Sequence, residues 1–139
     1  MSRDFQRQRV YDWEDQHIGP RDATPVPFQQ IPAIVQHCWP TSHPPKVEAL
    51  HSLSRNEGTG HRLRLCFPSD RPTRTWIILH EMAHALTFGD GHGPNFVGVY
   101  INLVEKYLNI PLAFLHYTAN VSNVKFKVSP TYNFSGDYL

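Results

Sequence analysis

The stretch from Trp76 to Leu86 reads W-I-I-L-H-E-M-A-H-A-L and contains the pattern H-E-x-x-H. Residues four apart lie on one face of a helix, so His80 and His84 would present two imidazoles to one metal ion. Glu81 would lie about 100° around the axis, close enough to reach a water molecule held there. At the chain's own His and Glu frequencies, the pattern is expected by chance only about 0.02 times. The stretch therefore predicts a metal-binding helix that carries its own general base.

The third metal ligand must come from outside this stretch, and two candidates follow it closely. His92 stands eight residues after His84, beyond a glycine-rich break. Three protein ligands and a water molecule make up a catalytic zinc site. Asp90 occupies the position of the last ligand in metzincins, but Thr87 replaces the glycine of that pattern and no methionine follows for a Met-turn. We favour His92 as the ligand, and Asp90 then becomes a candidate for orienting a ligand imidazole.

Glu105 is the remaining candidate for the third ligand. Its distance along the chain from the H-E-x-x-H pattern is typical of thermolysin-like enzymes. On a helical wheel, however, Glu105 lies about 180° from Phe96, on the polar side of the helix that follows. This position points away from the metal helix, and His92 remains the better choice.

The composition limits the class of protein. A chain of 139 residues with 40% hydrophobic residues is expected to form one domain with a real core. The net charge of +1 gives no indication of nucleic acid or of a membrane surface as a partner. The N-terminus is charged where a signal peptide would need apolar residues, so we expect a cytoplasmic protein. Cys38 and Cys66 form no C-x-x-C pair, and we expect two buried thiols.

The hydropathy pattern predicts a mixture of helices and strands. We expect helices at 3–17, from 72 or 73 to about 88, and at 94–109, with a short helical element at 28–38 and a short apolar segment at 112–117. Strands are expected at 46–50, 61–67 and 124–128. The first two strands would pair antiparallel across a turn at 55–60. A mobile tail is expected at 129–139.

The residues of the metal stretch resemble a known family. H-E-M-A-H-A-L at 80–86, followed by D-G-H-G-P-N-F at 90–96, is similar to the active site of SprT-like (Spartan-type) zinc metalloproteases. The resemblance covers about residues 76–107. It implies Zn²⁺ as the cofactor, His80, His84 and His92 as its ligands, and Glu81 as the general base. The fold that it implies is a small α+β domain, with a short antiparallel sheet packed on the active-site helix, as in a minimal zincin-like metalloprotease.

A second resemblance covers most of the chain. Together with R-D-F-Q-R-Q-R-V-Y at 3–11, the pattern is similar to a family of H-E-x-x-H metallohydrolases from actinobacteria and their phages, which has no settled activity. SprT-like proteins often carry a cysteine-based zinc module or other DNA-binding parts, and this chain has no cysteine pairs for such a module. DNA binding and DNA-linked protein substrates are therefore not carried over.

Three functions remain open from the sequence. The first is a zinc-dependent hydrolase of peptide bonds, acting on a protein or peptide. The second is a metal-dependent hydrolase of a non-peptide amide, and the third is a non-catalytic interaction protein stabilised by its metal. Glu81 argues against the third, because a structural site has no use for a base. The residue that stabilises an oxyanion stays open among Tyr100, Tyr107, Tyr117, His116, Arg62 and Arg74.

Overall fold

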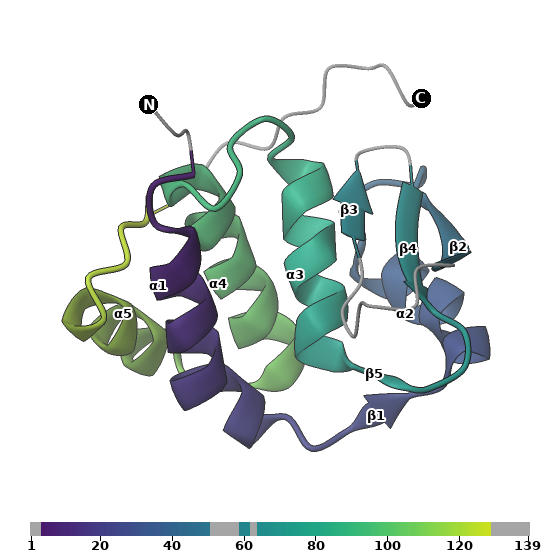
Figure 1. The fold of residues 1–139 in the computed structure, drawn as a ribbon, viewed down its shortest axis with the longest axis horizontal. Helices are drawn as coiled ribbons and strands as arrows, with labels where there is room; N and C mark the ends of the chain where they lie inside the picture. The colour runs from purple at the N-terminus through teal and green to yellow at the C-terminus, as the bar shows by residue number, and fades with distance from the viewer. Residues whose placement is uncertain (1–3, 51–58, 62–63, 129–139) are drawn as a thin grey trace.

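The computed structural model describes residues 4–50, 59–61 and 64–128 of the chain. Two helices, α3 (Thr75–Leu86) and α4 (Pro94–Leu108), pack against each other at the centre. On one side of them lie α1 (Arg7–Trp13) and α5 (Leu112–Val121), and on the other lie α2 (Ile31–Cys38) and the strands (Figure 1). The architecture is mixed helix and strand, as the α+β expectation requires.

Short elements complete the described chain. A π-helical segment, η1 (Glu14–Ile18), continues α1, and two 3₁₀ turns follow it: η2 (Gly19–Arg21) and η3 (Phe28–Gln30). The strands are β1 (Pro25–Val26), β2 (Lys46–Leu50), β3 (Thr59–His61), β4 (Arg64–Pro68) and β5 (Thr73–Arg74). The short helical element expected at 28–38 is present as η3 and α2.

Helix α3, which carries the H-E-x-x-H pattern, is almost wholly buried. Ile78, Leu79, Met82 and Leu86 are fully covered from solvent, and they pack into the same core as Phe96 and Val97 of α4. This burial holds α3 through hydrophobic contact rather than through helix propensity. The helix begins slightly later than predicted, because Thr73 and Arg74 form strand β5, which pairs antiparallel with β1.

Helix α4 confirms the predicted boundaries. Pro94 occupies its first turn, where the missing N–H costs no hydrogen bond. Asn109 ends it in the left-handed conformation, with φ of 57°. Asparagine tolerates this region better than most residues, and Pro111 follows too closely for the helix to continue.

The predicted antiparallel pairing of strands 46–50 and 61–67 is wrong. β2 pairs with β4 in parallel, with Lys46 opposite Arg64. The antiparallel partner of β4 is instead β3, and the sheet order is β2-β4-β3. A period-two pattern is common to parallel and antiparallel strands, so it predicts a strand without fixing the direction of its partner.

The predicted last strand at 124–128 is also wrong. These residues form no strand, and their backbone groups bond elsewhere: Lys125 N–H donates to the side chain of Gln6, and Lys127 N–H donates to the carbonyl of Pro94. The apolar segment expected at 112–117 belongs to the ten-residue helix α5.

The first helix is shorter than predicted, since α1 begins at Arg7. Its buried Trp13 donates a hydrogen bond of 2.9 Å from the indole nitrogen to the hydroxyl of Thr118 on α5. This bond ties the two outer helices together. At Glu14 the chain widens into the π-helical segment, and the Glu14 side chain is buried.

Other expectations concern residues at the margins of the described structure. The expected tail at 129–139, most of the expected turn at 55–60, and Arg62 lie outside the described residues. Cys38 is buried as expected, whereas Cys66 is only partly buried. Among the described helices, none has the length and apolar character needed to cross a membrane.

Candidate metal centre

Three imidazoles meet at one point of the structure. The Nε2 atom of His84 lies 3.2 Å from Nε2 of His80 and 3.2 Å from Nε2 of His92, and the third pair is 3.3 Å apart. His80 and His84 lie one turn apart on α3, as the sequence predicts. His92 reaches them from the loop after α3. The three residues form a cluster that could hold a metal ion.

The loop returns to the cluster through two glycines. Gly89 has φ of 96° and Gly91 has φ of 60°, both in the region that costs glycine no steric clash. These two residues turn the chain back on itself immediately after α3 ends. The turn brings the His92 side chain against those of His80 and His84.

Each imidazole is held through its other side. Nδ1 of His80 lies 2.5 Å from Oε2 of Glu14, and Nδ1 of His92 lies 2.9 Å from Oδ2 of Asp4. The backbone of Gly91 hydrogen-bonds His84. Since carboxylates only accept, Nδ1 of His80 and of His92 must carry the proton, and their Nε2 lone pairs are left to face the cluster centre.

The electrostatics favour neutral imidazoles. Burial lowers the pKa of His84 well below 6.5, and the nearby His80 and His92 lower it further. Burial is also the main reason that the pKa of His92 is lowered, although its hydrogen bond to Asp4 opposes the shift. Three imidazoles with converging Nε2 atoms, two of them with a lowered pKa, are a donor set that suits a divalent cation.

Aromatic rings surround the cluster. The ring of Phe96 lies 4.3 Å from that of His84 and 4.9 and 5.1 Å from those of His80 and His92, measured between centroids. Tyr11 of α1 contacts His92 at 5.1 Å and His80 at 6.2 Å. Phe96 therefore packs against all three imidazoles, and Tyr11 adds contacts to those of His80 and His92.

Glu81 is the chain neighbour of one histidine of the cluster. It follows His80 directly on α3, and its side chain is buried, with only 6% of its surface exposed. A carboxylate has the chemistry of a proton acceptor, which is the role that the sequence predicts for Glu81.

The two alternative ligands have other surroundings. The carboxylate of Asp90 accepts a hydrogen bond of 3.0 Å from the backbone N–H of Phe96, in the first turn of α4. A Cβ on Gly93 would lie only 2.7 Å from this carboxylate, which explains a glycine there. Glu105 is exposed on α4 and takes no part in the cluster. The carboxylates that hydrogen-bond the cluster imidazoles are those of Asp4, at His92, and Glu14, at His80.

Sequence reasoning missed Asp4, Tyr11 and Glu14. They lie 66 to 88 positions from the histidines that they contact, counting the Asp4–His92 and Glu14–His80 pairs. No spacing rule connects such distant residues. The sequence offered a signal only for Glu14, which directly follows the apolar residues Val10 and Trp13 of α1.

The candidate oxyanion-stabilising residues are scattered. Tyr100 is fully buried, its ring lies 5.6 Å from that of His80, and its hydroxyl donates to the carbonyl of Trp76. Burial and the charge of Glu14 raise its pKa well above 10, so the phenol stays protonated. The others lie elsewhere: Tyr107 packs on His37, Tyr117 is 66% exposed, His116 stacks on Phe126, and Arg74 bonds the carbonyl of Asp22.

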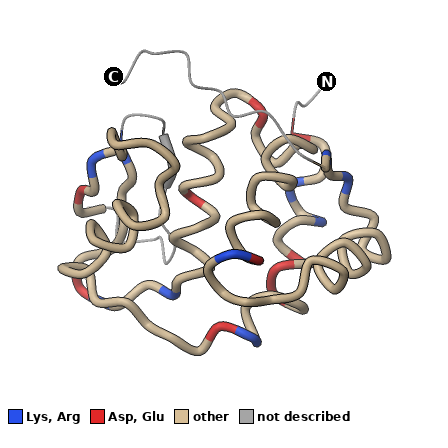
Figure 2. The backbone as a smooth tube through the Cα atoms, turned by 180° about the vertical axis from the view of Figure 1, so that it is seen from behind, with Lys and Arg blue, Asp and Glu red and all other residues tan. Residues whose placement is uncertain are grey.

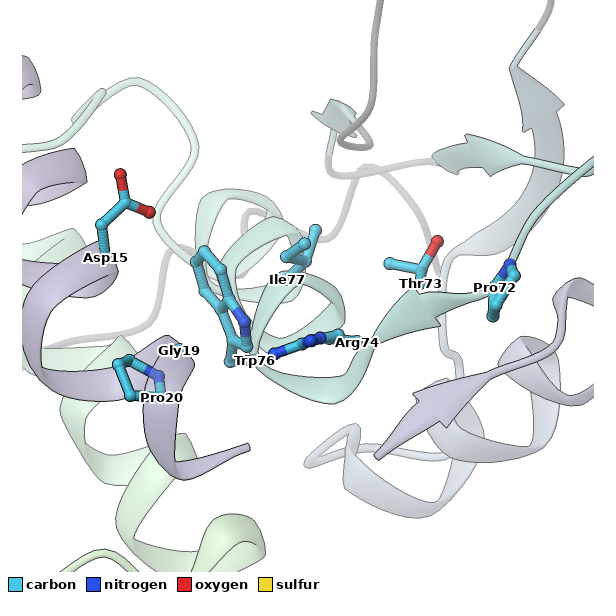
Figure 3. Close-up of a pocket in the computed structure, with 8 residues that line it drawn as sticks. All are labelled: Asp15, Gly19, Pro20, Pro72, Thr73, Arg74, Trp76 and Ile77. Atoms are coloured by element: carbon cyan, nitrogen blue, oxygen red, sulfur yellow. The ribbon is translucent and has the colours of Figure 1, made fainter. Parts of the chain in front are cut away.

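An open pocket of about 440 Å³ lies at the start of α3 (Figure 3). Trp76 in its wall precedes His80 by one helical turn, a rise of about 6 Å. Two buried polar atoms on its lining residues, Thr73 Oγ1 and Trp76 Nε1, have no hydrogen-bond partner among the described residues. The lining residues are Asp15, Gly19, Pro20, Pro72, Thr73, Arg74, Trp76 and Ile77.

Charges on the described surface are mixed in sign. Seen from behind, basic and acidic positions are interspersed along the backbone (Figure 2).

Comparisons with known protein families, with curated proteins and with solved structures found no match to this chain. Function must therefore be argued from the site itself.

Proposed function

We propose that this protein is a zinc-dependent hydrolase, and that its substrate is a peptide bond. The observation that supports this best is the set of three Nε2 atoms separated by 3.2 to 3.3 Å. Zinc–nitrogen bonds of about 2.0–2.1 Å in a tetrahedron place ligand nitrogens about 3.3–3.4 Å apart. The spacing of the imidazoles thus fits zinc, which would take water or substrate as its fourth ligand.

The chain's own residues supply the remaining chemistry. A zinc ion in this site would polarise a carbonyl and lower the pKa of a water molecule to about 7. Glu81 takes a proton from the attacking water and later passes it to the leaving amine. Asp4 and Glu14 hold protons on the Nδ1 atoms of His92 and His80, which keeps both Nε2 atoms available. Phe96 limits the access of bulk water from its side of the cluster.

The sheet supports a peptide as the substrate. β3 is one of the two edge strands of the order β2-β4-β3, and it lies beside α3 (Figure 1). An extended peptide adds to such an edge through backbone hydrogen bonds. The pocket at Trp76, one turn from His80, offers room for a neighbouring substrate residue. The proposal keeps the zincin-like fold and the SprT-like resemblance as its model, although the parallel pair β2–β4 differs from the antiparallel sheet that the resemblance implies.

The test is a cleavage assay on a denatured protein and on a mixed peptide library, read by mass spectrometry. We expect cleavage with zinc that stops when a chelator removes the metal. Cleavage that persists in chelator would contradict the proposal. Zinc binding without cleavage of any peptide, but with turnover of simple non-peptide amides, would replace the peptidase with an amidase.

A further inference from the structure

The N-terminal segment lies directly on the loop that carries the third histidine. Oδ1 of Asp4 accepts a hydrogen bond of 2.9 Å from the backbone N–H of His92, and both carboxylate oxygens lie within 3.1 Å of Nδ1 of the same residue. One side chain therefore fixes both the backbone and the imidazole of His92, across 88 positions of sequence.

Gln6 extends this attachment to a third segment. Its side chain is 1% exposed, and its amide nitrogen donates to the carbonyls of His92, at 2.8 Å, and Lys125, at 3.0 Å. Its amide oxygen accepts from the N–H of Lys125 at 2.8 Å. The Gln6 side chain is buried, and both of its N–H groups and its oxygen form hydrogen bonds. It therefore joins the N-terminal segment, the His92 loop and the segment at Lys125.

The fit between the segment and the loop is close. A Cβ on Gly91 would lie 3.2 to 3.5 Å from the carboxylate atoms of Asp4, and the φ of Gly91 is +60°. A side chain on residue 91 would therefore have to displace Asp4 as well as adopt a strained backbone. The Asp4 side chain thus occupies the space next to residue 91 that only a glycine leaves open.

The three ligands differ in how they are supported. His80 and His84 are held by the buried helix α3, whereas His92 stands on a loop between two helices. A loop ligand depends on hydrogen bonds for its backbone position and for the orientation of its ring. Those bonds come from residues 4 and 6.

We propose that Asp4 and Gln6 are positioning residues of the metal centre, and that metal affinity depends on the docking of the N-terminal segment against the His92 loop. Asp4 orients the His92 imidazole. Gln6 fixes the loop backbone to the segment at Lys125. The inference rests on the proposed function in one respect, that the histidine cluster binds zinc.

The test compares zinc affinities of full-length variants by competition with a chromogenic chelator. Asp4→Ala should weaken binding about 10- to 100-fold, which is typical for loss of a carboxylate behind a ligand histidine. Asp4→Asn should lie between Asp4→Ala and the wild type, because its amide oxygen still accepts from His92. The matched control is Asp12→Asn, which changes an exposed acid of α1 that accepts a hydrogen bond from the side chain of Gln8, and it should bind like the wild type.

Two further readouts separate positioning from general stability. The visible spectrum of the Co²⁺-loaded protein should change in Asp4→Ala and Asp4→Asn, since it reports ligand geometry, and should not change in Asp12→Asn. Hydrogen exchange at the Lys125 amide should become faster in Gln6→Ala but not in Asp4→Asn. If Asp4→Ala fails to fold without metal, Asp4→Asn decides.

The outcomes distinguish the two proposals. A wild-type protein that binds no zinc would overturn the proposed function. A wild-type protein that binds zinc, with Asp4 variants that keep its affinity within twofold and its Co²⁺ spectrum unchanged, would overturn the positioning role alone.

Discussion

Glu14 and His80 lie 66 positions apart in the sequence, yet Oε2 of Glu14 is 2.5 Å from Nδ1 of His80. Both side chains are buried. The contact fixes which imidazole nitrogen carries a proton, and so leaves Nε2 of His80 facing the other two histidines. A carboxylate behind a histidine also strengthens that histidine as a metal ligand.

Replacing Glu14 with Gln should weaken zinc binding about 10- to 100-fold, because the orienting negative charge behind His80 is lost. The measurement is zinc competition against a chelator of known affinity. Asp15→Asn is the matched control: it changes the adjacent, exposed acid, and should leave the affinity unchanged. Equal losses in both variants would contradict a specific role for Glu14.

The ligand set can be tested by stoichiometry. His92→Ala should reduce bound zinc from about one per chain to well below one after dialysis, since two imidazoles alone hold zinc poorly. Glu105→Ala should retain the metal, because Glu105 is exposed and outside the cluster. Asp90→Ala should also retain more zinc than His92→Ala. The Asp90 carboxylate accepts a hydrogen bond from the backbone at the start of α4, and we do not expect it to bind the metal. Loss of zinc in Glu105→Ala but not in His92→Ala would refute the assignment.

Replacing Glu81 with Gln separates catalysis from metal binding. The side chain keeps its size and loses its basicity, so zinc content and thermal stability should remain near wild type. Peptide cleavage should fall by about 10²- to 10⁴-fold, the usual contribution of a general base. Retained cleavage in Glu81→Gln would show that another group takes the proton.

The metal-free protein should lose stability as the pH falls below about 6.5, the usual pKa of histidine. Burial lowers the pKa of His84 and of His92 in the folded state. Below the unfolded pKa, the unfolded chain therefore binds protons that the folded chain does not. The free energy of unfolding then falls by about 1.4 kcal/mol per pH unit for each imidazole that stays neutral.

Thermal unfolding in chelator, followed from about pH 7.5 down to about pH 5, measures this dependence. His84→Gln should flatten the pH profile, whereas His43→Gln, which changes an exposed histidine, should not. A wild-type profile that is flat or rises toward acid would contradict the lowered pKa values.

Local signals in the sequence predicted several parts of the site and its neighbourhood. His80, Glu81 and His84 follow from helical spacing, and Pro94 marks the start of α4. The position of His92 required only a loop that turns back, and glycines on both sides of residue 90 allow such a turn. These features succeed because each depends on residues close together in the chain.

Pairings between distant segments were not predictable in the same way. The alternation at 46–50 gave a strand but not its parallel partner, and the alternation at 124–128 belongs to a segment held by Gln6 and Pro94 instead. Period-two alternation reports which face of a segment is buried, and it carries no information about the group that satisfies the backbone.

The sequence by itself determined the helix that carries the H-E-x-x-H pattern, with Glu81 on it, and the three histidines that could serve as metal ligands, because helix periodicity and glycine turns act over a few residues. Only the tertiary structure decided that the three imidazoles meet within 3.3 Å, and that Asp4 and Glu14 stand behind two of them. The physical reason is that these contacts depend on where the segment before α1 and the segment η1 after it lie relative to α3 and its following loop. That arrangement is set by the whole buried core rather than by any local pattern.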